Sequence, residues 1–330
     1  MTQKSTLLIG FGLGTEARGD GADWRGFWGG LIGRLDGAAD FLTLDDRFAD
    51  PGRDGLDAIL LANWLGPRSS RIGIIAGAPL NFVEPFHVST AIATLDYVME
   101  GRAGLLAHRL DEARSREAHR AIGKLKGFPA IDAPSLDRDA LDAVDVVRRL
   151  WDSWEDDAII RDTESQRFVD GRKLHYVDFQ GADFRVLGPS ITPRPPQGQP
   201  VVALSWTPET DPALARAADL VFVPAGVDFA ETRARLGEGA GGQGPAVVAD
   251  IAIGPDGAAA EGVVAVARAA EAGGAGGVRL VLPDPHRQIE HAIGTLVPAL
   301  RAGSEAPSPG GNLRGRFGLP AARNRYAAAA

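Results

Sequence analysis

Eight short apolar segments alternate along this chain with segments of helical character. Their residues are mainly valine, isoleucine and leucine without regular polar alternation, which is typical of parallel strands covered by helices. Eight such strand–helix pairs within about 250 residues have the size of a (β/α)8 barrel. The sequence therefore predicts a TIM barrel, with strands at residues 6–12, 41–44, 71–76, 103–107, 201–205, 220–223, 246–253 and 278–282.

Three segments depart from this alternation. A polar connection runs from the fourth strand to residue 134, before a helix at 137–154. Residues 155–199 are charged, and their alternating stretch at 177–186 predicts a β-hairpin that turns at 180–182. The last residues, 306–330, are rich in proline, glycine and arginine and are expected to lie irregularly on the surface. We therefore expect one barrel domain over residues 1–305, with an insertion at 155–199, followed by a tail.

Composition excludes several kinds of chemistry and partner. The absence of cysteine excludes disulfides, thiolate ligands and thiol nucleophiles, and no two of the six histidines have a metal-site spacing. A net charge of −8 offers little basic surface for nucleic acid or an anionic membrane. No apolar run approaches the roughly 18 residues of a membrane span, and no leader peptide is visible. We therefore expect a cytoplasmic protein without a metal site.

Glycine clusters raise the question of a phosphate loop. Gly10, Gly12 and Gly14 follow the first strand, as a dinucleotide fingerprint would, but the third glycine comes one residue early and no apolar helix follows directly. A loop without nucleotide binding is the favoured interpretation. The richer clusters at 237–244 and 273–277 run from a helix into a strand, which places them on the barrel face that serves stability.

The active face of such a barrel is built by residues that follow each strand. At this rim the chain places two adjacent acids, Asp45 and Asp46, and two histidines, His108 and His286. The rim positions predict no Ser/His/Asp set and no metal cluster, although distant residues could still converge in space. A rim so poor in catalytic side chains fits an enzyme whose chemistry belongs to a bound organic cofactor.

Several longer stretches resemble the bacterial luciferase-like flavin monooxygenases, in the branch of the nitrilotriacetate, EDTA and dibenzothiophene-sulfone monooxygenases. The similarity is strong over residues 41–223 and weaker over residues 313–320. It implies a (β/α)8 barrel that is usually dimeric, and that takes reduced FMN from a separate reductase to oxidise a small organic substrate with oxygen. The matching stretches are 82–87 (FVEPFH), 91–98 (AIATLDYV), 100–104 (EGRAG), 150–157 (LWDSWEDD) and 184–202 (FRVLGPSITPRPPQGQPVV).

The resemblance also implies positions for the flavin. An acid often lies near the flavin ring at the end of the family's second strand, and polar residues line the pocket after the third, fourth and fifth strands. His108 and Asp46 are the catalytic candidates, with Asp46 slightly favoured over Asp45. The implied cofactor-binding positions are Asp45, Asp46, Ala76, Gly77, Leu106, His108, Arg109, Trp206 and Thr207.

Several of these positions differ from the family pattern. Leu106 and Leu110 stand where polar residues usually line the pocket, Trp206 replaces a glycine, and Pro208 removes an amide donor from the phosphate loop. Thr207 keeps the hydroxyl of that loop.

Each candidate also has a structural alternative. Asp45 and Asp46 could cap a helix, His108 could pair with a carboxylate, and Arg109 could be solvated instead of meeting an anion. Trp206 either fills part of the pocket or stacks on a ligand.

Two functions of different class follow. The first is a two-component FMN-dependent monooxygenase; the second is a barrel that has lost flavin binding and serves as a binding or partner subunit. A less favoured variant of the first uses a deazaflavin. An open cavity at the carboxyl-terminal face of the barrel would count against the second function, because a barrel without a ligand can fill its pocket.

Overall fold

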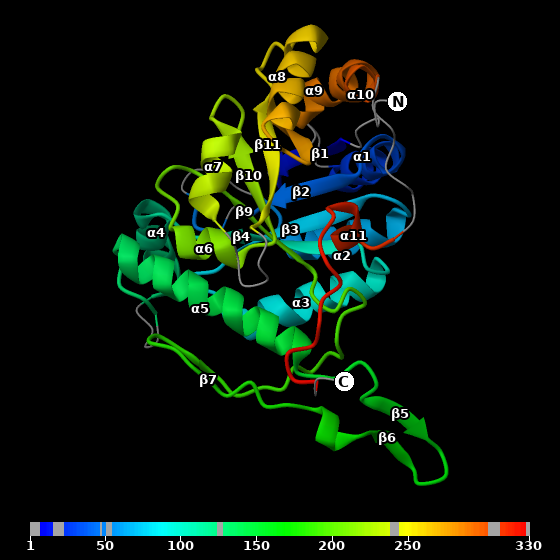
Figure 1. Ribbon diagram of the computed structural model, residues 1–330, viewed down its shortest axis with the longest axis vertical. Helices are drawn as coiled ribbons and strands as arrows, with labels where there is room; N and C mark the ends of the chain where they lie inside the picture. Colours follow the sequence, from blue (N-terminus) through cyan, green and yellow to red (C-terminus); the bar gives the residue numbers. More distant parts are fainter. Residues whose placement is uncertain are drawn as a thin grey trace.

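The computed structural model describes residues 7–15, 23–46, 48–50, 55–123, 128–237, 244–302 and 311–327. Within them, eight parallel strands close into a barrel in the order β1-β12-β11-β10-β9-β4-β3-β2, with helices around it (Figure 1). This confirms the predicted (β/α)8 barrel. Its strands are β1 (Leu8–Gly14), β2 (Phe41–Asp45), β3 (Gly73–Pro79), β4 (Ala103–His108), β9 (Val201–Ser205), β10 (Leu220–Pro224), β11 (Ala246–Ala252) and β12 (Gly277–Leu282).

Aspartate begins most of the described helices. Seven of them have an aspartate N-cap whose carboxylate accepts a backbone N–H of the first turn, which satisfies a donor that the helix itself leaves unpaired. Many acids of this chain therefore have a structural role. The helices are α1 (Trp24–Ala38), α2 (Ala58–Leu65), α3 (Pro85–Val98), α4 (Glu112–Ile122), α5 (Ala133–Asp152), α6 (Pro212–Ala217), α7 (Phe229–Leu236), α8 (Ala260–Ala272), α9 (Pro285–His291), α10 (Val297–Arg301) and α11 (Leu313–Arg316).

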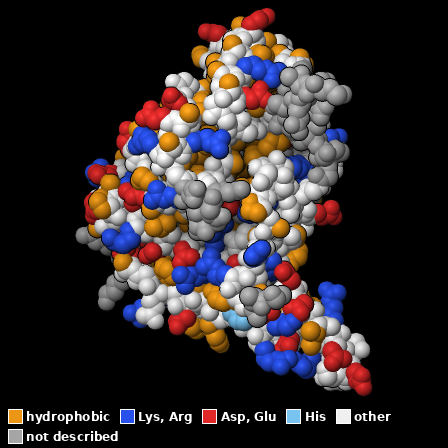
Figure 2. All heavy atoms as spheres, in the orientation of Figure 1, with side chains coloured by type: hydrophobic (Ala, Val, Ile, Leu, Met, Phe, Trp, Pro, Cys, Tyr) orange, Lys and Arg blue, Asp and Glu red, His pale blue; other side chains and the backbone are white. Residues whose placement is uncertain are grey.

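Two segments contain more structure than their sequence indicates. The polar connection after β4 contains α4, whose polar sequence gives few apolar positions to mark it as a helix. In the insertion, β7 (Phe179–Gln180) pairs with β8 (Arg185–Val186) where the alternation predicts a hairpin. A second hairpin joins β5 (Ile159–Asp162) and β6 (Arg167–Val169), and it projects away from the barrel (Figure 1). Its surface carries both signs of charge (Figure 2).

The lower half of the barrel lumen is apolar and filled. Alternate residues of each strand point inward, and those near the amino-terminal ends form one buried cluster. The ring of Phe41 fits because its neighbour on β1 is Gly10, where an added Cβ would lie 2.2 Å from that ring. The glycines of β1 thus serve packing inside the barrel. The glycine-rich stretch at 238–243 and the expected first strand residue, Thr6, lie outside the described residues.

The described part of the C-terminal segment, residues 311–327, is largely irregular and exposed as its composition predicts, but it also places buried residues at the end of the barrel. Leu313 is buried in the lower lumen cluster, and Phe317 packs on Phe41 with ring centroids 5.3 Å apart. The segment therefore covers the amino-terminal end of the barrel. Burial of an apolar side chain at this place stabilises the fold, and a composition rich in proline and glycine does not indicate such burial.

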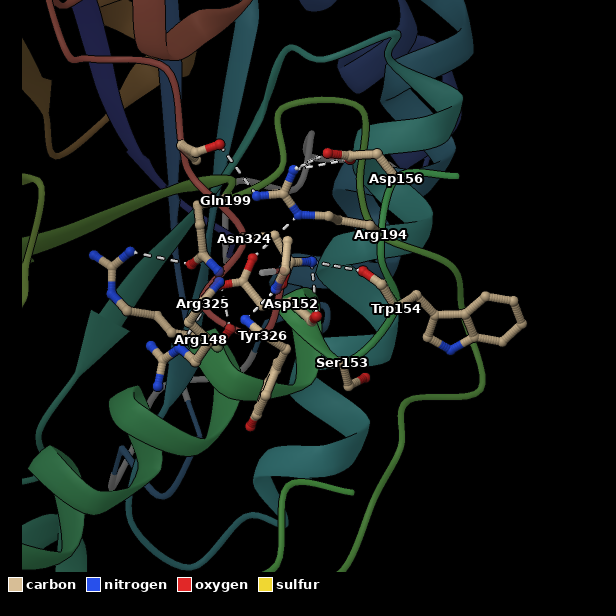
Figure 3. A network of polar contacts seen from close by, with 12 residues as sticks. Arg148, Asp152, Ser153, Trp154, Asp156, Arg194, Gln199, Asn324, Arg325 and Tyr326 are labelled. Carbon is tan, nitrogen blue, oxygen red and sulfur yellow. Dashed lines mark hydrogen bonds and ion pairs between the residues drawn. The ribbon is translucent and has the colours of Figure 1, made fainter. Parts of the chain in front are cut away.

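A polar network holds this segment against the insertion (Figure 3). Arg194 donates to Asp152 at 3.1 Å and to the carbonyl of Ala322 at 3.2 Å. Asn324 donates to the carbonyls of Asp152 and Trp154.

Candidate functional site

The carboxyl-terminal half of the lumen is open. Val201 and Ala203 of β9 point into the lumen, so Ser205, two residues further, lies on the same side, and it is exposed. Pro224 of β10 and Ala252 of β11 are likewise exposed, at the ends of strands whose inward residues include the buried Phe222 and Val248. Solvent therefore reaches the inner wall of the barrel at this end, as a ligand would.

Two of the sequence candidates meet at this mouth. Nε2 of His108, at the end of β4, lies 3.0 Å from Oδ1 of Asp45, at the end of β2. The strand between them carries Gly77, where a Cβ would come within 2.8 Å of Nε2 of His108. The His108 side chain is 13% exposed and that of Asp45 is 41% exposed. Gly77 thus leaves the space in which an acid–imidazole pair forms beside the open lumen.

The floor of the open part is polar. Arg279 of β12 is buried and donates from Nε to Oδ1 of Asp250 on β11 at 2.7 Å. Its Nη1 donates to the hydroxyl of Thr43 on β2 at 3.1 Å. Gly12 makes room for this side chain, because a Cβ there would lie 3.3 Å from Cδ of Arg279. The ion pair separates the open mouth from the filled lower lumen.

Asp46, the acid favoured from the sequence, lies in a different environment from the pair of Asp45 and His108. It is 7% exposed, and its Oδ1 accepts a hydrogen bond from the backbone N–H of Phe48 at 2.7 Å. Burial raises the pKa of its carboxyl, with Asp57 contributing in the same direction. Because Asp45 is the inward residue of β2, Asp46 faces the helix layer and holds the turn after the strand.

Two further candidates point away from the lumen. Ala76 and Trp206 belong to the hydrophobic cluster between the barrel and its helices. Trp206 is 5% exposed, and its ring lies 5.6 Å from the guanidinium of Arg235. The large ring therefore neither fills the lumen nor stands ready to stack on a ligand in it. Leu106 does face the lumen, but in the buried lower cluster.

The last two candidates lie at the rim. Arg109 donates to Asp137 at 2.7 Å and to the carbonyl of Ala133, which ties the end of β4 to the start of α5. Thr207 is exposed, and its backbone N–H donates to the hydroxyl of Thr210 at 2.9 Å. Arg109 thus has a structural role, whereas the Thr207 hydroxyl is accessible to a ligand.

Arg279 and Asp250 are not among the site residues predicted from the sequence. Each interrupts an otherwise apolar strand, which is the signal that could have revealed them. A charged residue in the middle of a barrel strand is costly to bury unless it is paired. The pairing could not be predicted, because it depends on which neighbouring strand the residue faces.

The mouth can be tested for its fit to a flavin. A flavin ring needs a concave site with a few hydrogen-bonding groups along a mostly apolar wall. The open lumen offers the acid–imidazole pair, the exposed hydroxyl of Ser205 and the polar floor, against Pro224, Ala252 and Val281. No group of three or more metal-ligating side chains occurs in the described part of the chain. The residues present fit an organic ring cofactor.

The chain belongs to the luciferase-like monooxygenase family, whose model matches residues 36–241. This confirms the resemblance drawn from the sequence. It is 33% identical over 185 residues to N-acetyl-S-(2-succino)cysteine monooxygenase of Bacillus subtilis (strain 168), covering 56% of this chain and 41% of that protein. It is 35% identical over 195 residues to one of the subunits of pristinamycin IIA synthase from Streptomyces pristinaespiralis, covering 59% of this chain and 60% of that protein.

Nitrilotriacetate monooxygenase component A of Aminobacter aminovorans is 33% identical over 168 residues, which are 51% of this chain and 36% of that protein. The chain thus spans between 36% and 60% of the length of these three curated relatives. Among solved structures, the EDTA monooxygenase (EmoA) from Chelativorans sp. BNC1 superposes with a TM-score of 0.72 at 19% identity, over 96% of this chain and 99% of that chain. At this identity the likeness shows the fold.

No helix in the described ranges is both long and apolar enough to cross a membrane.

Proposed function

We propose that this protein is a two-component, FMN-dependent monooxygenase that oxidises a small organic substrate with O2. The observation that carries the proposal is the acid–imidazole pair of Asp45 and His108 beside an open lumen, on a chain of the luciferase-like monooxygenase family. When bound, reduced FMN would supply the two electrons that allow one oxygen atom to enter the substrate while the other leaves as water.

The residues of this chain would bind and orient the ligands. Oδ1 of Asp45 lies 3.0 Å from Nε2 of His108 and would orient the imidazole electrostatically, and the ring would accept and return a proton during the reaction. Ser205 and Thr207 supply hydroxyls at the exposed end of β9. The filled lower lumen and the C-terminal segment keep water from entering through the opposite end of the barrel.

The partners follow from this function. A flavin reductase would deliver reduced FMN in a transient encounter, and the protein would act as a homodimer in the cytoplasm. Two of the relatives are named as a component and as a subunit, which supports a requirement for a second protein.

The alternative of a barrel without flavin, suggested by the loss of polar pocket positions, predicts a filled pocket. Trp206, the residue expected to fill it, packs in the outer layer instead, and the inner wall is exposed at Ser205, Pro224 and Ala252. These placements favour ligand binding over a purely structural barrel.

The test is an anaerobic titration of the purified protein with oxidised and then reduced FMN, followed by absorbance and calorimetry. We expect saturable one-to-one binding that is tighter for the reduced form. Deazaflavin is titrated in parallel, because tighter deazaflavin binding would replace FMN as the cofactor. Absence of binding for both cofactors would refute the proposal and favour the partner-subunit function.

A further inference from the structure

An ion pair between the neighbouring strands β11 and β12 lies in the lumen, where TIM barrels usually have branched apolar side chains. Arg279 is 6% exposed and makes four hydrogen bonds to three strands of the barrel. Two of these join its Nε and Nη2 to the carboxylate of Asp250. One face of the guanidinium lies over the ring of Phe222, with 3.7 Å between Cζ and the ring centroid. The side chain is thus held in a fixed plane across the barrel.

Stability alone gives no reason for this arrangement. Removing two charges from water is costly, and apolar residues of similar volume often replace a buried pair without loss. The lower lumen of this same barrel is filled by apolar residues in that way. The chain also gives up side-chain volume at Gly12 to accommodate Arg279. A binding role explains a charged floor directly beneath an open mouth.

The hydrogen bond from Arg279 to Ser205 is weak enough to be replaced by a bond to a ligand. Its Nη2 lies 3.5 Å from the hydroxyl of Ser205, the long limit of a hydrogen bond, and Ser205 is exposed to the mouth. The donor can therefore turn to a stronger acceptor that enters from that side. An anionic oxygen or nitrogen is such an acceptor, because hydrogen bonds to charged groups are shorter and stronger than neutral ones.

We propose that Arg279, oriented by Asp250, binds the negatively charged edge of reduced flavin, formed by N1 and the C2 carbonyl, and so makes the protein prefer reduced over oxidised FMN. The inference rests on the proposed function and adds to it the residue that distinguishes the two redox states. The oxidised ring is neutral at this edge, so it gains a weaker bond from the same guanidinium. Arg279 is thereby a positioning and specificity residue.

The experiment compares dissociation constants for oxidised and reduced FMN, measured anaerobically by calorimetry. The main variant carries Arg279→Met and Asp250→Asn together, so that no unpaired charge stays in the lumen. We expect its affinity for reduced FMN to fall about tenfold or more, the size of one charge-assisted hydrogen bond, with oxidised FMN changed by less than about threefold. Arg279→Lys, which keeps the charge without the planar fork, should retain part of the preference.

A matched control removes a similar pair outside the lumen. Arg148 donates to Asp219 at 2.9 Å, with side chains 17% and 13% exposed. Arg148→Met and Asp219→Asn together should lower thermal stability and leave the ratio of the two FMN dissociation constants unchanged. An unchanged ratio in the double variant would overturn the inference while the proposed function stands. Absence of flavin binding by the unaltered protein would instead overturn the proposed function, and the inference with it.

Discussion

His108 and Asp45 meet over a glycine. The two residues end β4 and β2, which are separated by β3, and their side chains approach to 3.0 Å because Gly77 on β3 has no side chain to stand between them. Neighbouring barrel strands lie about 4.8 Å apart, so a pair that spans two of them needs such a gap. The glycine is as much a part of the site as the two ionisable groups.

Gly77→Ala should therefore damage both the site and the barrel. The added Cβ would lie 2.7 Å from the backbone nitrogen of Asp46 and from the carbonyl oxygen of Leu44, and backbone cannot move aside as a side chain can. We expect a loss of about 1–3 kcal/mol in the free energy of unfolding, measured with urea, together with weaker FMN binding.

The matched control is Gly33→Ala on the exposed side of α1, where nothing lies within 4 Å of the added Cβ. It should stabilise the protein by about 0.5–1 kcal/mol, because alanine favours the helix. Equal effects of the two substitutions would contradict the role given to Gly77.

Substitution of Asp45 should affect mainly turnover, whereas substitution of Asp46 should affect mainly stability. Asp45→Ala removes the partner of His108 at the mouth and should lower the rate of FMN-dependent oxygen consumption at least about tenfold, with the unfolding free energy changed by less than about 0.5 kcal/mol. Asp46→Ala leaves the half-buried N–H of Phe48 without its acceptor and should cost about 1–2 kcal/mol of stability. Turnover and urea unfolding of both variants check this. A larger loss of turnover in Asp46→Ala would restore the preference of the sequence analysis.

Gln197 should prove essential to the closure of the amino-terminal end. Its Nε2 donates to the buried carboxylate of Asp96 at 2.6 Å, and its Oε1 accepts the backbone N–H of Arg314 at 3.0 Å. Gln197→Ala removes both bonds in a buried place and should cost about 2–4 kcal/mol, with faster hydrogen exchange over residues 313–319. Gln180→Ala on the exposed hairpin is the control and should change stability by less than about 0.5 kcal/mol. Unchanged exchange at 313–319 would show that the segment is held without Gln197.

Asp139 should give the stability a measurable dependence on pH. Burial raises the pKa of its carboxyl to about 6, and the charges of Asp183 and Asp142 act in the same direction. A raised pKa in the folded state means that folding favours the protonated form, so stability falls as the pH rises from about 4 to about 6 and is constant above. The expected fall is on the order of 2–3 kcal/mol.

Asp139→Asn replaces the titrating carboxyl with an amide, which has no titrating proton. The amide keeps an oxygen that can accept the hydrogen bond from Asn81, which donates to Asp139 at 2.8 Å. Urea unfolding at several values between pH 4 and pH 7.5 should show that the variant gains stability relative to the unaltered protein as the pH rises. A difference that does not change with pH would refute the shifted pKa.

The sequence predicts the barrel well because repeated apolar strands and helices need no knowledge of distant contacts. It indicates α4 poorly, since that helix buries little and its polar residues resemble those of a loop. It also misses the β5–β6 hairpin, whose strands are short and exposed. The C-terminal segment illustrates a third limit: Leu313 is apolar in a polar context, and only the open end of a barrel gives it a place to be buried.

At the site, the sequence by itself determines the strand ends at which function lies, and the family to which the chain belongs. From the sequence Asp46 is slightly favoured over Asp45, which the structure places inward, and nothing separates Ala76 from Gly77. Only the tertiary structure decides which member of each pair faces the lumen, because successive residues of a strand point to opposite sides and a shift of one residue exchanges them. The parallel pairing of β11 with β12 likewise decides that Arg279, 29 residues beyond Asp250 in the chain, becomes its neighbour in the sheet, and closure of the barrel brings the same guanidinium to Thr43 of β2.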